Sequence, residues 1–222
     1  MQLNVKETAE LFNVSEKTIY RWIDKEIIPV YKINNSYRFD RLELLEWANS
    51  QKKKIAPEVL SKIPEVKLYT IKETLEIGNI FYRVNGKTKK TVLKSAVNLI
   101  KLPDTVDRKF LYHSLLSREN LSSTGIGNGI AIPHIRNPFL LDIDKPSINI
   151  CFLENSVNFN AIDEKPVNIL FLLLSNHIRV HLNLLSRLSY ILQNKKVIKT
   201  LKEETVRKKM LDTIYEVEKK EL

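Results

Sequence analysis

The segment SRENLSSTGIGNGIAIPH, from Ser117 to His134, holds three of the five glycines of the chain. A short apolar stretch, Ile130 to Ile132, follows the glycines and predicts a strand that ends just before His134. Glycine allows positive φ and close backbone approach, so successive N–H groups in such a loop can converge on an anion. Neutral imidazole, with a reference pKa of about 6.5, is a competent nucleophile near pH 7. The pattern therefore indicates a histidine beside a phosphate-cradling loop that comprises Thr124, Gly125, Gly127 and Gly129.

The spacing alone leaves a second interpretation open, in which a tight turn precedes a buried, hydrogen-bonded histidine. The loop is not a P-loop, because no Lys-Ser/Thr pair follows it, and it lacks the third glycine position of the dinucleotide fingerprint. His177 and His181 are four residues apart in HIRVH, but the glutamate of HExxH is missing. We therefore expect no metal site and no cofactor.

Outward from this segment, helical and extended patterns alternate through residues 67–222. The strand candidates are FYRV, SINICFL and PVNILFLLL, which are short apolar runs. The helix candidates are Lys89–Leu99, Asp107–Ser117, His181–Leu192 and one or two helices within Lys199–Glu218. In the third of these, Leu182, Leu185, Leu188 and Leu192 are expected to form the buried stripe. The alternation predicts an α/β domain with a central mixed sheet flanked by helices.

Residues 1–50 form a different, mostly helical pattern. VKETAELF predicts a short helix that ends at Asn13-Val14, and Ser15 is a suitable N-cap for a second helix from Glu16 to Lys25. PVYKI and SYRFD predict a β-hairpin around Asn34-Asn35. A third helix is expected from Arg41 to Ala48. This order is that of a helix-turn-helix followed by a wing.

In a helix-turn-helix the second helix enters the major groove, which is about 12 Å wide. Trp22 and Trp47 are interpreted as core residues, whereas the polar side of the second helix is free to meet DNA. The hairpin would reach backbone phosphates or the minor groove. The candidate DNA-binding residues are Lys17, Thr18, Tyr20, Arg21, Lys32 and Arg38.

The formal net charge of the chain is +10, and its distribution is uneven. Residues 1–66 contain 11 Lys+Arg and 10 Asp+Glu, whereas residues 67–222 contain 25 and 16. Net charge alone therefore does not identify the DNA-binding part. The run Lys52–Lys54 and the two prolines that follow predict a linker over residues 51–66, between domains at 1–50 and 67–222.

The chain has one cysteine, Cys151, which lies inside INICFLE and is interpreted as a buried strand residue. The longest continuous apolar run, Ile169 to Leu174, is far shorter than the roughly 18 residues of a membrane span. The N-terminus lacks the apolar region of a signal peptide. A disulfide-free, cytoplasmic protein without a membrane partner is expected.

The first 45 residues or so, NVKETAELFNVSEKTIYRWIDKEIIPVYKINNSYRFDRLELLEWA, resemble the excisionase-like winged DNA-binding domains related to the MerR group. The aromatic-rich second helix, IPVYKI and YRFD occur in the order of that family. The resemblance implies that this unit binds DNA. A small helical module for protein contacts is the alternative.

From about Leu68 to the C-terminal region the chain resembles enzyme IIA domains of the fructose/mannitol and nitrogen-regulatory type, from the bacterial phosphotransferase system. The resemblance rests on SRENLSSTGIGNGIAIPH, NFNAIDEKPVNILFLLL and HLNLLSRLSYIL. It implies that His134 accepts a phosphoryl group from a histidine-containing phosphocarrier protein, with His181 and Arg118 beside it. Ile135 departs from the Gly or Pro that relatives commonly have after the acceptor.

The two resemblances together imply a DNA-binding transcriptional regulator controlled by histidine phosphorylation, a phosphohistidine carrier rather than an enzyme that turns over a small molecule. One alternative is a IIA carrier that passes the phosphoryl group to a IIB partner. Another is a IIA-like adaptor that is never phosphorylated. The partners considered are DNA, the phosphocarrier donor, a IIB-type or regulatory protein and a second copy of the chain.

Overall fold

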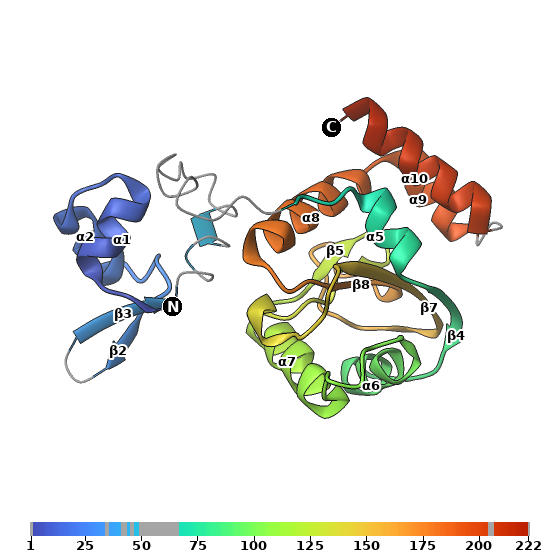
Figure 1. Cartoon of the computed structure of the whole chain (residues 1–222), viewed down its shortest axis with the longest axis horizontal. Coiled ribbons are helices and arrows are strands. Elements are labelled where there is room, and N and C mark those ends of the chain that lie inside the picture. Colours follow the sequence, from blue (N-terminus) through green and yellow to red (C-terminus); the bar gives the residue numbers. More distant parts are fainter. Residues whose placement is uncertain are drawn as a thin grey trace. The chain divides into compact units, whose positions relative to one another are not determined.

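The computed structural model describes residues 2–33, 36–40, 44, 47–48, 67–203 and 207–221. The chain divides into two compact units, Met1–Val66 and Lys67–Leu222, and each is described by itself (Figure 1). The predicted linker, the Asn34-Asn35 turn and most of the predicted helix Arg41–Ala48 lie outside the described residues.

The first unit contains two short helices, α1 (Val5–Phe12) and α2 (Glu16–Asp24), as predicted. Asn13 ends α1 in the left-handed conformation at φ 50°, and the Ser15 hydroxyl accepts the Thr18 N–H at the start of α2. The predicted β-hairpin is confirmed as β2 (Tyr31–Ile33) and β3 (Ser36–Asp40). A further strand, β1 (Gln2–Leu3), pairs antiparallel with β3 and was not predicted, because two residues carry no readable periodicity.

Three aromatic rings hold the helices of this unit together. Phe12, Trp22 and Trp47 meet edge-on or tilted, with ring centroids 5.4 to 5.9 Å apart. Trp22 is 8% exposed, which confirms its interpretation as a core residue. Such pairs add stability beyond the area that they bury.

The second unit is an α/β fold around a five-stranded mixed sheet in the order β4-β7-β8-β6-β5. The β4–β7 and β6–β8 pairs are parallel, and the β7–β8 and β5–β6 pairs are antiparallel. The predicted fold class is confirmed. The strands are β4 (Ile80–Val84), β5 (Gly125–Gly127), β6 (Ile130–Ala131), β7 (Ser147–Val157) and β8 (Val167–Leu174).

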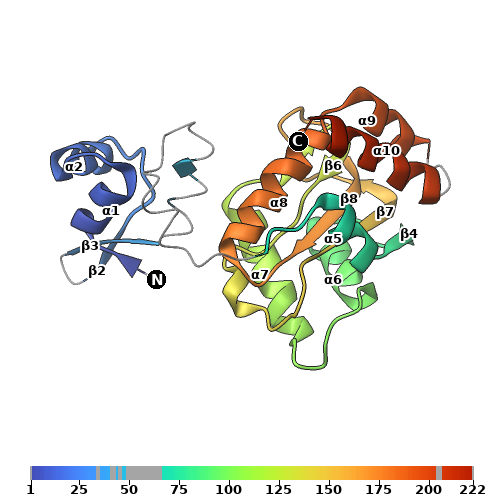
Figure 2. The same ribbon diagram turned by 45° about the horizontal axis from the view of Figure 1, so that its top comes forward.

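Helices cover both faces of this sheet (Figures 1 and 2). One face carries α6 and α7, and the other carries α5 and α8. α10 packs against α5 and α8, and α9 packs against α10. A short 3-10 turn, η1 (Pro138–Leu140), precedes β7. The helices are α5 (Ile71–Ile77), α6 (Lys89–Leu99), α7 (Arg108–Leu121), α8 (Ile178–Ile191), α9 (Lys195–Lys202) and α10 (Arg207–Glu221).

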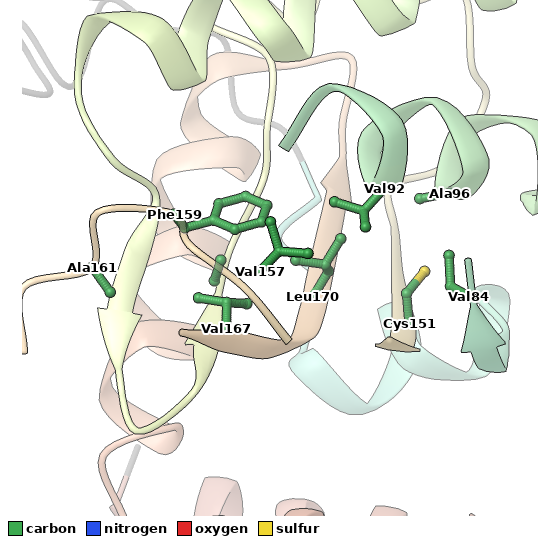
Figure 3. Packing of buried hydrophobic residues seen from close by; sticks show 10 residues of the cluster. Val84, Val92, Ala96, Cys151, Val157, Phe159, Ala161, Val167 and Leu170 are labelled. Atoms are coloured by element: carbon green, nitrogen blue, oxygen red, sulfur yellow. The ribbon is translucent and has the colours of Figure 1, made fainter. Parts of the chain in front are cut away.

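Figure 3 shows the core beneath α6, where Val92 and Ala96 face Cys151 and Leu170 of the sheet. Cys151 is fully buried on β7, as predicted, and burial raises the pKa of its thiol to about 12. This thiol is therefore a packing group and not a nucleophile. Within the described parts of the chain, no helix is both long and apolar enough to cross a bilayer.

The predicted buried stripe of α8 is wrong in part. Leu182 and Leu185 are only half-buried, whereas Leu184, Leu188 and Ile191 are buried. The helix is rotated relative to the prediction because His181 itself, 2% exposed, belongs to the buried face. Counting leucines alone therefore misplaced the face, since a polar residue occupies one of its positions.

Candidate functional site

The β6–β8 pairing places His134. Ile130 and Ala131 lie opposite Ile169 and Leu170, and His134 continues this register as a parallel bridge to Leu173. The Leu173 N–H donates to the Pro133 carbonyl oxygen at 3.0 Å. His134 is thus held beside β8, the central strand of the sheet, and is 3% exposed.

The hydrogen bonds of His134 define its tautomer. Nδ1 lies 2.8 Å from the Ile132 carbonyl oxygen, which can only accept, so Nδ1 carries the proton. Nε2 lies 3.1 Å from Arg118 Nε, whose N–H can only donate, so Nε2 presents its lone pair. The ring is therefore a neutral imidazole with Nε2 as its nucleophilic atom.

His181 stands beside this ring, with the ring centroids 5.2 Å apart and the planes tilted by 55°. It lies in the first turn of α8, and its Nδ1 pairs with the Ser175 hydroxyl at 2.9 Å. Its Nε2 is buried and has no hydrogen-bond partner among the described residues. A polar atom buried without a partner is costly, so this Nε2 is a candidate to hydrogen-bond a group brought in by a partner.

Arg118 lies in the last turn of α7, where a cation is favoured by the helix dipole. Its Nη1 donates to both the carbonyl and the hydroxyl oxygen of Ser122, each at 3.0 Å. These bonds aim the guanidinium at His134 and fix its orientation. The structure thus brings together three residues that the sequence singled out, Arg118, His134 and His181.

The pKa of both histidines lies below the usual value. Burial is the main cause for His134, and His181 and Arg118 lower its pKa further. Burial and Arg118 lower the pKa of His181 to about 4. Both rings are therefore neutral at pH 7, and His134 needs no deprotonation before it can attack an electrophile.

The structure does not bring the glycine-rich turn to His134, which corrects the predicted cradle. His134 pairs four residues further along β8 than Ile130 does, about 13 Å at 3.3 Å per residue, and Gly127 and Gly129 precede Ile130. The turn, with φ of +94°, +57° and +80° at 127–129, instead contacts the segment that precedes β8. The Asn128 N–H donates to Asp163 Oδ2 at 2.9 Å, so the anion at this turn is a carboxylate of the chain itself.

Thr124 and Gly125 lie at the other end of β5, closer to the histidine. The Ile132 N–H donates to the Thr124 carbonyl oxygen, which sets Thr124 beside the residue whose own carbonyl holds His134. The space around Gly125 is filled by Ala161. Of the predicted cradle residues, Thr124 is therefore the one linked to His134 through Ile132, whose N–H donates to Thr124 and whose carbonyl accepts from His134.

Sequence reasoning missed Glu119, which anchors this loop. Its Oε2 accepts the N–H and the hydroxyl of Thr124, at 3.0 and 2.5 Å, and its Oε1 pairs with Lys89 Nζ at 3.2 Å. Glu119 is 3% exposed, so both partners are needed to offset the loss of hydration. A charged residue inside the quoted segment, directly after Arg118, was the available signal.

A groove of about 300 Å³ opens beside Arg118, between α7 and η1. Phe110 and Leu140, 40% and 56% exposed, supply its apolar surface, and Arg136 adds a cation. His134 is buried and does not line this groove, whereas Arg118, which donates to its Nε2, does.

On the first unit, the candidate DNA-binding residues of α2 share one exposed side. Lys17, Tyr20 and Arg21 are exposed, and Thr18 lies among them along a shallow groove of about 350 Å³. Tyr20 also packs edge-on against Tyr37 of β3, with ring centroids 6.1 Å apart. Lys32 and Arg38 lie on β2 and β3; the structure gives no side-chain description for Lys32, and Arg38 is half-buried.

The lowered pKa values predict an acid-sensitive second unit. The unfolded chain binds protons on both histidines below pH 6.5, whereas folded His181 binds one only near pH 4, so stability falls as the pH falls through this window. His181 alone should cost about 2 kcal/mol between pH 7 and 5. Urea unfolding at pH 7 and 5 measures the difference in the free energy of unfolding.

The His134→Gln/His181→Gln double variant should lose most of this pH dependence. His113→Gln, at an exposed position of α7, should keep it. Equal pH dependence in the two variants would contradict the assignment of the effect to His134 and His181.

Comparisons with known proteins agree with this architecture. The family model described as "Phosphoenolpyruvate-dependent sugar phosphotransferase system, EIIA 2" matches residues 73–217, and a helix-turn-helix domain model matches residues 3–52. The nitrogen regulatory protein of Pseudomonas aeruginosa is 37% identical over 126 residues, 55% of this chain and 79% of that protein.

Two further relatives extend the comparison. The fructose-specific EIIABC component of Bacillus subtilis is 30% identical over 152 residues, which cover 67% of this chain and only 24% of that protein. The crystal structure of the nitrogen regulatory protein IIA-Ntr from Neisseria meningitidis superposes with a TM-score of 0.55 at 28% identity, over 65% of this chain and 98% of that one.

Proposed function

The chain belongs to the phosphoenolpyruvate-dependent sugar phosphotransferase system EIIA 2 family and carries a helix-turn-helix domain ahead of its EIIA unit, and from this premise we propose that it is a DNA-binding regulator controlled by phosphorylation of His134. The observation that carries the proposal is the state of His134. Its Nε2 offers a lone pair in a neutral ring, between an arginine and a histidine whose own Nε2 has no described partner. Relatives named as nitrogen regulatory proteins favour a regulatory role over sugar import.

The proposed chemistry is a phosphoryl transfer between two nitrogens. The Nε2 lone pair of His134 attacks the phosphorus carried by the donor phosphohistidine, and the donor P–N bond breaks with its electron pair returning to the donor ring. Arg118 Nε, which now donates to Nε2, would turn to a phosphoryl oxygen, while its Nη1 stays anchored on Ser122. His181 Nε2–H would donate to a second oxygen. These donors stabilise the charge as it is redistributed.

The proposed regulatory effect is electrostatic. A phosphoryl group adds a charge of about −1.5 to −2, next to a groove that carries Arg118 and Arg136. The change alters which partner docks there or how the DNA-binding unit acts. The alternative is a carrier that transfers its phosphoryl group to a IIB partner. In that case the IIB partner would dock at the same groove, and DNA binding would not be required.

The decisive experiment measures DNA binding in both states. Purified protein is incubated with phosphoenolpyruvate, enzyme I and the histidine phosphocarrier, and the phosphorylated and untreated forms are titrated against selected duplexes. We expect acid-labile labelling and a difference in DNA affinity between the two forms. Labelling without DNA binding in either form would support the carrier, and DNA binding without labelling would leave the IIA unit as an adaptor.

Substitutions at two arginines of the first unit test how DNA is read. Arg21, exposed on α2, is expected to contact a base, so Arg21→Ala should cost about 1–3 kcal/mol at one base position and relax specificity there. Arg38 on β3 is expected to contact a phosphate, so Arg38→Ala should weaken all sequences equally and lower the salt slope by about one. Titrations on a selected and a scrambled duplex at two salt concentrations measure both effects. A loss below about 0.5 kcal/mol at Arg21 would make it an ordinary solvated residue.

A further inference from the structure

The α9–α10 surface, formed by the solvent-facing side chains of α9 and α10, is strongly basic. On α9, Lys195, Lys196, Lys199 and Lys202 are all exposed. On α10, the cations gather in the first and last turns, with Arg207, Lys208 and Lys209 at one end and Lys219 and Lys220 at the other. Against these, the exposed acidic residues among described positions 195–220 are Glu203, Asp212 and Glu216.

The five of these cations that lie in the first turns are unfavourably placed for the helices themselves. The N-terminus of a helix carries a partial positive charge and favours acidic residues. α9 nevertheless begins with Lys195 and Lys196, and α10 begins with three consecutive cations. Helix stability therefore does not explain these five cations, whereas the helix dipole favours Lys199, Lys202, Lys219 and Lys220 in the last turns.

Ion pairing does not explain them either. Lys196 pairs with Glu216 at 2.6 Å, and Lys199 lies 3.9 Å from Glu203. Lys195, Lys202, Lys208 and Lys209 form no ion pair with any residue that the structure describes. Their charges are thus available to an anionic partner.

The chemistry of the surface selects the class of partner. The apolar residues of both helices, such as Val197, Leu201, Met210 and Ile214, are buried against the unit, and no large apolar side chain of α9 or α10 is exposed within the described residues. A protein-binding patch usually has an apolar or aromatic centre, and a membrane-binding helix needs an apolar face. Flexible lysines without an apolar centre suit a row of phosphates, which each lysine meets as a point charge.

We propose that the α9–α10 surface contacts the phosphate backbone of duplex DNA that flanks the site bound by the helix-turn-helix unit. This proposal rests on the proposed DNA-binding function and deepens it, because it assigns a DNA contact to the EIIA unit. Between described residues 48 and 67 lie 18 residues, whose covalent reach is at most about 65 Å, or roughly 19 base pairs. Both units can therefore engage one duplex of ordinary operator length, and the second contact becomes intramolecular.

The test uses the full chain and two charge-matched variants. The first variant changes Lys195, Lys202, Lys208 and Lys209 to glutamine. The control changes Lys87, Lys90, Lys94 and Lys101, which are exposed on or beside α6, to glutamine. Binding to 30-base-pair duplexes is followed by fluorescence anisotropy across a salt series, and circular dichroism checks that each variant folds.

If two of the four lysines contact phosphates, the slope of log K against log salt falls by about two, and the affinity at 0.1 M salt falls more than tenfold on selected and scrambled duplexes alike. The control should retain the wild-type slope. Equal losses in the two variants would reduce the effect to net charge and overturn the proposal, as would an unchanged slope in the first variant. Arg21→Ala and Arg38→Ala distinguish failure of this proposal from failure of the proposed DNA-binding function. Their effects on DNA affinity persist if only the α9–α10 contact is absent, and they vanish if the protein binds no DNA. Lysine-dependent retention on phosphatidylserine vesicles without a change in DNA slope would assign the surface to membranes instead.

Discussion

We expect His134→Gln to abolish acid-labile phosphorylation of the chain completely. Nε2 of His134 carries the lone pair of the neutral ring, and glutamine removes this atom while keeping a polar side chain of similar length. Loss of the nucleophile removes the covalent product rather than slowing it. Labelling with radioactive phosphoenolpyruvate in the presence of enzyme I and the phosphocarrier, followed by acid treatment and peptide mapping, measures the result.

His181→Gln is the matched comparison for this experiment. His181 lies beside the acceptor ring and has no proposed covalent role, so this variant should still be labelled, more slowly, and should transfer the phosphoryl group poorly. His113→Gln, at an exposed position of α7, should label as the wild type does. Labelling of His134→Gln together with its loss in His181→Gln would exchange the two roles. Circular dichroism and urea unfolding establish that each variant is folded.

The second large effect concerns stability, at the junction of three helices. The Glu218 carboxylate on α10 accepts the N–H groups of Ile71 and Lys72, at 2.6 and 3.0 Å, and pairs with Arg187 of α8 at 3.0 Å. Glu218 is 6% exposed. Glu218→Ala should destabilise the second unit by about 3–5 kcal/mol, since it leaves a half-buried arginine and the start of α5 without their partner.

Urea unfolding of the full chain, followed by far-ultraviolet circular dichroism, measures this loss. Glu216→Ala is the control, because Glu216 lies two residues away on the same helix and forms an exposed pair with Lys196. It should leave the unfolding midpoint unchanged, as exposed pairs contribute little. Equal midpoints for Glu218→Ala and the wild type would show that α5 is held by its apolar contacts alone.

Elements with a strong local signal were predictable from the sequence. α1 and α6 begin and end where their caps and apolar spacing predict, at Val5–Phe12 and Lys89–Leu99. The start of α8 was missed by three residues, because its N-cap is His177, which is not a preferred capping residue. α5 was not predicted, although its capping box, Thr70 and Glu73, is a local signal in the sequence.

The site could be predicted as a set of residues but not as a geometry. The quoted segment singles out His134, and the resemblance adds Arg118 and His181. The predicted role of the glycines as a phosphate cradle was wrong, because closely spaced glycines indicate a tight turn but do not determine which part of the fold the turn contacts. The strand register decides that, and it turns Gly127 toward Asp163.

The sequence by itself determined the two-part architecture, the helix-turn-helix pattern and the identity of the candidate nucleophile, because these depend on local periodicity, capping and a motif contained in one continuous stretch. Only the tertiary structure decided which nitrogen of His134 is nucleophilic, since the proton on Nδ1 is assigned by the Ile132 carbonyl and the lone pair on Nε2 by Arg118. The tertiary structure also decided that Glu119 anchors the loop, that the glycine turn meets a carboxylate, and that α9 and α10 pack together while their cations stay exposed. Such relations join residues far apart in the chain or depend on the direction of side chains, and both follow from strand register and helix packing rather than from local sequence.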